Sequence, residues 1–271
     1  MGQKSNLTTV RKFLKNINLF TYSKQEFLIG FNFLEHFNRF CNLNNSIIVN
    51  PNLNFIGSQM YLTFSLFIRS AQIKKIKKRL KIKRNKLKFN TRFLDVFFDS
   101  ILKHLKLLRI NLLNVKITLL NNYLISEKFF LRFLYLRIQF FRDSLFPRRY
   151  NLFFDFLKIS SLFISRKIPA QTFLFFLGQI FKFVPKKKHN RYFSFIKKTF
   201  NLMLDYDKSI LGLKLLIGGR LKGKLRKKKI FIQTGKIPIQ SIAQDIEFTR
   251  LHVFSKHGVF GFKLWVCFKL N

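Results

Sequence analysis

The amino-acid sequence predicts an α+β fold. The first observation is the order of patterns in residues 166–271, where two stretches with helical periodicity precede four strand-like stretches. The second is the apolar content: 48% of the 271 residues are hydrophobic and 38 are Phe, enough for one or two domains with real cores. The third is the charge, because 52 Lys and Arg against 11 Asp and Glu give +41. A folded chain this cationic needs a polyanionic partner, either nucleic acid or an anionic membrane surface.

The amino-terminal part is predicted to contain an arm, a helix and two strands. Residues 1–20 are basic with little periodicity, which is typical of an arm. Ser23-Lys24-Gln25-Glu26 matches a capping box, so we expect a helix from there to about Phe40. Ile47–Val49 and Met60–Ile68 predict strands, with a turn at Asn50–Asn52 between them. We assign residues 21–84 to this first domain.

The most cationic segment is Lys74–Lys88, in which ten of fifteen positions are Lys or Arg. Hardly any acid lies near it in the sequence, so we favour contacts with phosphate over a merely solvated face. The candidate phosphate-binding residues of this segment are Lys74, Lys75, Lys77, Lys78 and Arg79.

Residues 85–150 are predicted to be a mostly helical insertion. Within it, Phe129–Phe141 interleaves aromatic residues with arginines. Base stacking on these aromatic rings is one interpretation, but we favour packing of the Phe side chains in a core with Arg facing solvent. Residues 151–165 are interpreted as a return to the first domain, with a strand at Leu152–Ile159.

Residues 166–271 are predicted to form a second domain. Thr172–Phe183 and Arg191–Leu204 have helical periodicity, and in the second helix Lys197 and Lys198 are expected to face outward. Glycine-containing turns separate the expected strands. These strands are Leu211–Ile217, Lys227–Gln233, Ile246–Ser255 and Val259–Phe268.

The sequence holds no recognisable catalytic, metal or cofactor motif. It has no paired carboxylates and no phosphate-binding G-x-x-x-x-G-K-S/T loop, and Cys41 and Cys267 are too few for a zinc set. The longest strongly apolar uncharged run, Ile168–Phe181, is too short to cross a bilayer, so we expect no transmembrane span. An abundance of Phe, Lys, Asn and Ile with only three Ala indicates AT-rich codons, and hence an organelle genome.

One segment resembles a known family. Gly219-Arg220-Leu221, then Thr234-Gly235-Lys236-Ile237-Pro238, then Gly258-Val259-Phe260-Gly261 through Trp265 are similar to the carboxy-terminal domain of the ribosomal small-subunit protein three (S3) family. The opening Met1-Gly2-Gln3-Lys4 also matches how that family begins. The resemblance implies a type II KH domain followed by a domain of two helices on a four-stranded sheet. Ile47–Ile68 would supply two strands of a divergent KH-like domain whose glycine loop is replaced by Gln72–Lys78, which lacks glycine.

The resemblance also implies a function. Members of the family sit in the head of the small ribosomal subunit, bind rRNA and line the mRNA entry channel beside neighbouring ribosomal proteins. Lys197 and Lys198 align with basic residues of the family's entry-channel helix. The Arg pair that the family carries one turn earlier is missing here or displaced to Arg191 and Lys186–Lys188. We expect a mitochondrial matrix ribosome, no enzymatic activity, no small-molecule substrate, no cofactor and no metal. The expected rRNA contacts in this domain are Arg220, Lys222, Lys224, Arg226, Lys227 and Lys228.

Two other function classes stay open on the sequence alone. An organellar intron maturase or another nucleic-acid enzyme would explain a basic chain of this size, but it needs acidic metal ligands, and acids are sparse. A basic protein held on a membrane surface by amphipathic Phe/Lys helices would explain the charge and the aromatic content together.

Overall fold

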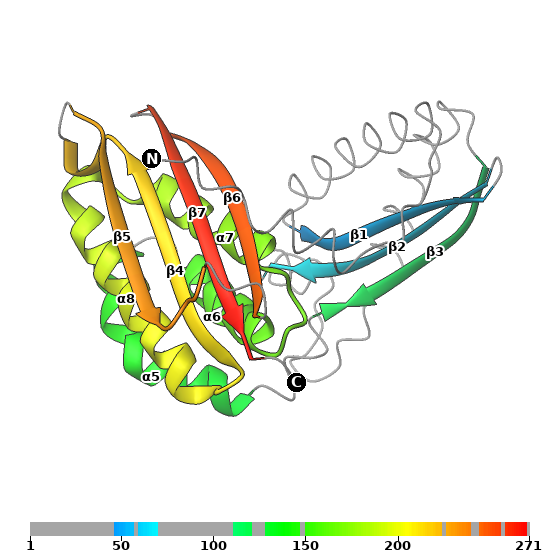
Figure 1. The fold of residues 1–271 in the computed structure, drawn as a ribbon, viewed down its shortest axis with the longest axis horizontal. Helices are drawn as coiled ribbons and strands as arrows, with labels where there is room; N and C mark the ends of the chain where they lie inside the picture. The colour runs from blue at the N-terminus through cyan, green and yellow to red at the C-terminus, as the bar shows by residue number, and fades with distance from the viewer. Residues whose placement is uncertain are drawn as a thin grey trace, which may run out of the picture. The chain divides into compact units, whose positions relative to one another are not determined.

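A mixed three-stranded sheet forms the first of two compact units (Figure 1). The computed structural model describes residues 46–56, 59–69, 111–120, 128–146, 150–223, 226–239, 244–255 and 258–269. Strands β1 (Ser46–Ile56) and β2 (Gln59–Ile68) are antiparallel, and β3 (Asn111–Leu119) runs parallel to β2. The two strands predicted before residue 70 are therefore confirmed.

Two predictions for this part of the chain were wrong. The expected turn at Asn50–Asn52 is a register shift within β1, between Val49 and Asn52, so the strand continues past Pro51. A bulge tolerates proline because the ladder hydrogen bond is already interrupted there. The second correction is β3, a strand in the segment that was expected to be mostly helical. A side-chain hydrogen bond of 2.6 Å between Ser65 Oγ of β2 and Thr118 Oγ1 of β3 links the two strands.

Within the described part of the chain, the second unit has four helices: α5 (Lys128–Leu145), α6 (Tyr150–Ile164), α7 (Ala170–Phe183) and α8 (His189–Tyr206). The last two confirm the predicted helix pair. The strand predicted at Leu152–Ile159 was wrong, because these residues lie inside α6. The pattern is helical: the buried positions of α6 include Phe153, Phe156, Leu157, Ser160 and Ile164, at spacings of three and four residues.

The second unit is completed by a four-stranded antiparallel sheet in the order β5-β4-β7-β6. The predicted strands are confirmed, although the glycine pair expected as a turn, Gly218-Gly219, ends β4 instead. Their bounds are Ile210–Gly219 for β4, Lys228–Gly235 for β5, Asp245–Ser255 for β6 and Gly258–Phe268 for β7.

The helices lie in two layers on one side of this sheet (Figure 1). α7 packs on β6 and β7, α8 packs on β4 and β5, and α5 and α6 pack against α8 and α7. The fold class is therefore α+β, with two helices on the sheet as expected and two more behind them.

Aromatic contacts fill the core between these layers. The rings of Phe163 and Phe173 stack with centroids 4.5 Å apart and an interplanar angle of 8°, which joins α6 to α7. Phe156 and Phe195 join α6 to α8 at 4.9 Å, and Phe181 meets Phe260 of the sheet at 4.9 Å. Burial of each such ring contributes roughly 1.5–3 kcal/mol. The high Phe content thus provides the packing between layers.

Several sequence predictions fall outside the described residues. They include the basic arm, the helix expected up to Phe40, Cys41, the cationic segment Lys74–Lys88 and Lys224. Among the helices that the structure describes, none is long and apolar enough to cross a membrane.

Candidate nucleic-acid interface

Helix α8 presents a basic face away from the core. Phe195, Ile196, Phe200 and Met203 are buried, whereas Lys197 and Lys198 are exposed, as the sequence predicted. Arg191 is also exposed and lies seven residues, or about two helical turns, before Lys198, so the two share one stripe of the helix. The three cations expected at the mRNA entry therefore lie on one exposed side of α8.

A lysine-rich 3-10 turn, η2 (Lys186–Lys188), leads into α8. Lys186 and Lys187 are exposed, but Lys188 is half-buried and its Nζ donates a hydrogen bond to the carbonyl of Ser144 at 2.7 Å. This carbonyl lies in the last turn of α5, where the helix dipole favours a cation. Lys188 is therefore a structural tie between helices, and Lys186 and Lys187 remain exposed to solvent.

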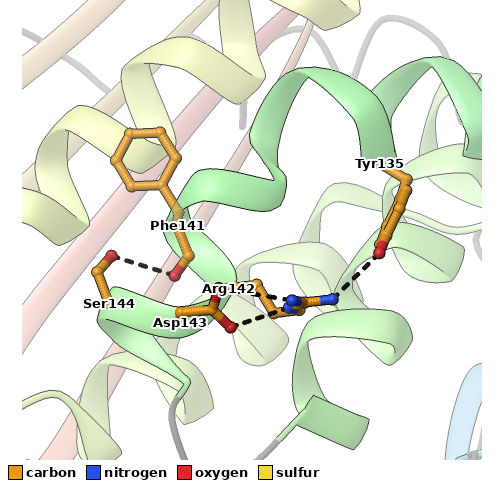
Figure 2. Close-up of polar contacts among 5 residues, drawn as sticks. All are labelled: Tyr135, Phe141, Arg142, Asp143 and Ser144. Carbon is orange, nitrogen blue, oxygen red and sulfur yellow. Dashed lines mark hydrogen bonds and ion pairs between the residues drawn. The ribbon is translucent and has the colours of Figure 1, made fainter.

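The end of α5 uses another cation internally (Figure 2). Arg142 pairs with Asp143 at 3.0 Å and donates to the Tyr135 hydroxyl at 3.1 Å, while Ser144 Oγ donates to the Phe141 carbonyl at 3.3 Å. The Asp143 side chain is 64% exposed, so the ion pair contributes little stability. It does occupy the guanidinium, which makes Arg142 a poor candidate for a phosphate contact.

The turn after β4 brings a second set of cations to the start of α8. Arg220 and Lys222 are exposed, and Lys222 lies in the 3-10 turn η3 (Leu221–Gly223) with φ +58°. Its backbone N–H donates to Nδ1 of His189 at 3.1 Å. A Cβ added to Gly223 would lie 3.5 Å from Cδ of Lys186, so η2 and η3 lie against each other.

We call this surface the basic corner. It consists of Lys186, Lys187, Arg191, Arg220 and Lys222. The structure thus brings together residues from two predicted sets, one expected at rRNA and one expected at mRNA. Arg226, Lys227 and Lys228 are exposed and lead into β5, whereas Lys197 and Lys198 lie further along α8.

The glycine before Arg220 has a steric role. A Cβ on Gly219 would collide with the Phe260 ring, so the chain can leave the sheet at the end of β4 only with glycine at this position. His189 is 2% exposed and its ring lies 4.7 Å from that of Phe181 and 6.2 Å from that of Phe260. Apolar packing and one hydrogen bond therefore fix the backbone that carries Arg220 and Lys222.

Asp205 and Asp207 lie at the end of α8 opposite the basic corner, whereas Asp143 of α5 is the neighbour of Ser144, which Lys188 contacts. Asp207 accepts hydrogen bonds from the backbone N–H and the hydroxyl of Ser209, at 2.8 and 2.6 Å, which places its carboxylate in the turn after α8. Within the described residues no group of three or more His, Cys, Asp or Glu could hold a metal ion.

Burial raises the pKa of Tyr192 well above its ordinary value, and its hydroxyl donates to the Leu177 carbonyl at 2.8 Å. The exposed Lys and Arg side chains of the basic corner can bind an anion through charge and hydrogen bonds.

One prediction about aromatic residues was only partly right. In α5, Phe130, Leu134 and Ile138 are buried as expected, but Phe129 is 85% and Phe140 is 77% exposed. The sequence could not show this, because helical periodicity does not tell how many neighbours cover a helix. α5 is in the outer layer, and its contacts are with α6 and α8.

Three curated relatives illustrate what the chain is similar to. It is 33% identical over 55 residues to the small ribosomal subunit protein uS3 of Persephonella marina, which is 20% of this chain and 24% of that protein. It is 30% identical over 60 residues to uS3c of Trieres chinensis, 22% and 28% of the two chains. A segment of this chain is related to the uS3 family. With uS3c of Gossypium barbadense the identity is 32% over 71 residues, 26% of this chain and 32% of that one.

These matches confirm the resemblance to S3 drawn from the sequence. The uS3c relatives are chloroplast forms, so the uS3 relatives include proteins of organelles as well as of bacteria. The match spans about a quarter to a third of the length of each of these relatives. No protein-family model matches the chain.

Proposed function

We propose that the chain is a structural constituent of the mitochondrial small ribosomal subunit, where it binds rRNA in the head and lines the mRNA entry channel. The observation that carries the proposal is the basic corner, whose two segments are joined by the His189–Lys222 hydrogen bond, on a chain with a segment related to uS3. The relatives are named as ribosomal subunit proteins, which supports a structural role rather than catalysis.

The mechanism is neutralisation of phosphates by fixed cations. Each Lys or Arg that contacts a phosphate releases condensed counterions, so binding weakens as salt rises. Contacts of this kind position an RNA and do not read its bases. Lys186, Lys187, Arg220 and Lys222 would hold rRNA, and Arg226, Lys227 and Lys228 would extend the contact toward β5.

Arg191, Lys197 and Lys198 would face mRNA at the entry channel. Their shared exposure on one side of α8 supports this assignment. A row of cations along a rigid helix can hold single-stranded phosphates and resist the passage of structured RNA.

The first unit would be the divergent KH-like domain implied by the resemblance. A mixed three-stranded sheet is present there. The candidate phosphate contacts would stand in the sequence between β2 and β3, in place of the glycine loop, and they are Lys74, Lys75, Lys77, Lys78 and Arg79. The location in mitochondria rests on the AT-rich coding bias and on the relatives from organelles.

Sedimentation in a sucrose gradient tests the proposed function. In detergent and moderate salt, the chain is expected to sediment with small ribosomal subunits of purified mitochondria, and ribonuclease or magnesium depletion should release it. Recovery at the top of the gradient with ribosomes intact would refute the ribosomal assignment. Release by detergent alone would favour a membrane-surface protein, for which the exposed Phe129, Leu136 and Phe140 of α5 are the relevant observation.

A further inference from the structure

The four-stranded sheet has a second face that the described helices do not cover. Along β4, Leu213, Leu215 and Ile217 are buried beneath the helices, so Lys214 and Leu216 point the other way. We call the side that carries Lys214 the open face. In Figure 1 the described helices all lie on the opposite side of the sheet.

Aromatic side chains gather on the open face. Trp265 of β7 pairs in register with Phe248 of β6, and their rings lie 5.1 Å apart at 38°. On the neighbouring strand β4, Lys214 is the register partner of Trp265, and its Nζ lies 5.8 Å from the indole ring centroid. Phe231 and Phe254 are 60% and 68% exposed, although Phe is one of the residue types most often buried in folded proteins.

The open face is cationic. By strand alternation, no Asp or Glu of the described residues points to this side, since Asp245 and Glu247 fall on the helix side of β6. Glu247 shows this directly, because its Oε1 accepts a hydrogen bond from the Ala170 N–H at the start of α7. The Lys and Arg of the open face are Lys214, Lys227, Lys229, Arg250 and Lys263.

Two glycines leave a bare strip of backbone on the two interior strands of the open face, close to the end of β4. Gly218 and Gly261 are register partners on β4 and β7, and neither has a positive φ. A Cβ on Gly261 would meet nothing within 4 Å, and one on Gly218 would meet only the side chains of Lys229 and Lys227, at 3.8 and 4.0 Å. The fold therefore does not require glycine at either position, in contrast to Gly219. Glycines of this kind in strands suit the close approach of another molecule.

We propose that the open face binds a single-stranded segment of RNA. Bases would stack on Trp265, Phe231 and Phe254, and the surrounding lysines and Arg250 would contact the phosphates. The proposal rests on the proposed ribosomal function, and it adds a second RNA surface with a different chemistry from the basic corner. A protein partner is disfavoured because five cations without an acid would have to be matched by a strongly acidic surface.

The single tryptophan makes the proposal directly measurable. Trp265 fluorescence of the full chain is titrated with oligouridylate and, separately, with heparin. Heparin has the charge but no bases, so stacking predicts that oligouridylate quenches the emission and heparin does not. Equal effects of the two polyanions, or no quenching by RNA, would overturn the proposal.

Substitutions at exposed positions locate the contact. Phe231→Ala and Phe254→Ala should each weaken oligouridylate binding by about fivefold or more. Gly261→Val should weaken binding as well, because the added side chain has free space in the fold but occupies the bare strip. Phe129→Ala is the matched control, since that Phe is 85% exposed on α5. Equal losses in the control and the open-face variants would refute the assignment.

Cross-linking in the assembled particle separates this inference from the proposed function. Ultraviolet cross-linking of purified subunits should join peptides of β5 or β7 to RNA. If the chain sediments with the subunit but these peptides cross-link only to protein, the open-face inference fails while the proposed function stands. If the chain does not sediment with the subunit, the proposed function fails, and the oligouridylate titration alone decides the inference.

Discussion

Nδ1 of His189 accepts a hydrogen bond from the backbone N–H of Lys222, 33 residues away in the sequence, at a distance of 3.1 Å. This contact joins the start of α8 to the turn after β4. Since both segments carry exposed cations, one buried imidazole holds the two halves of the basic corner together.

His189→Phe tests this link. The phenyl ring keeps the contacts with Phe181 and Phe260 but cannot accept the hydrogen bond, so the free energy of unfolding should fall by about 0.5–1.5 kcal/mol. Urea denaturation of the full chain measures the difference. His252→Phe, at an exposed position of β6, serves as the control and should leave the unfolding midpoint nearly unchanged. Equal stability of His189→Phe and the wild type would show that the hydrogen bond has no structural weight.

Replacing Lys197 and Lys198 together with Ala should separate assembly from translation. Both side chains are exposed on α8, so folding and incorporation into the subunit are expected to persist. Initiation and elongation on mRNAs with stable structure should slow relative to unstructured mRNAs, because cations that hold the incoming strand are lost. Unchanged translation of structured mRNA in organelle extracts would contradict the entry-channel role.

Arg220→Ala combined with Lys222→Ala should reduce the salt dependence of rRNA binding. Removing a phosphate contact lowers the slope of log K against log salt by about one, so the double variant should lose about two. Filter binding to a transcript of the small-subunit rRNA at several salt concentrations gives the slope. Lys208→Ala is the control, since Lys208 is an exposed cation beyond the far end of α8. A slope that does not change would place the phosphate contacts elsewhere.

Tyr192→Phe should affect stability in a pH-dependent way. Burial raises the pKa of the Tyr192 phenol above its unfolded value of 10.0, so the native state holds this proton more tightly than the unfolded state does. The stabilisation is complete below about pH 10 and is lost as the pH rises toward the folded pKa. At neutral pH the free energy of unfolding of the variant should be lower by about 0.5–1.5 kcal/mol, because the hydrogen bond to the Leu177 carbonyl is missing. Urea midpoints at neutral and alkaline pH should therefore fall less steeply with pH in Tyr192→Phe than in the wild type.

Glu247→Gln probes the start of α7. Pro169 offers no capping side chain, and the Glu247 carboxylate accepts the Ala170 N–H at 3.1 Å instead. Glutamine keeps an acceptor but removes the negative charge at the positive end of the helix dipole, which should cost about 0.3–1 kcal/mol. Glu247→Ala, which removes the acceptor as well, should cost more. Thermal unfolding of both variants orders the two effects, and identical losses would rule out the charge as a contributor.

The sequence predicted the second unit well for a local reason. Its strands alternate and its α7 and α8 carry apolar residues at helical spacing, so Lys197 and Lys198 could be placed outside from the pattern alone. α6 was misread because its apolar residues are nearly continuous, and such runs fit a strand or a buried helix equally well. β3 was missed because its pairing with β2 joins segments far apart in the sequence.

The candidate site was predictable in composition but not in geometry. The basic residues on either side of Arg191 and Arg220 are visible as charge runs, yet nothing local indicates that His189 and Lys222 meet. The open face was missed for a similar reason, since the row formed by Lys214, Trp265 and Phe248 comes from three strands. Such rows exist only once the sheet order is known.

The order β5-β4-β7-β6 also constrains when this unit can form during synthesis. β7 is the last of the four strands in the chain, yet it lies in the interior of the sheet between β4 and β6. Until Phe268 has left the ribosome that makes it, β4 and β6 have no shared partner, and the four strands cannot close into one sheet. An incomplete product would therefore lack the surface that Trp265 and Lys263 help to build. Strand order thus limits formation of the open face to copies in which β7 has been synthesised.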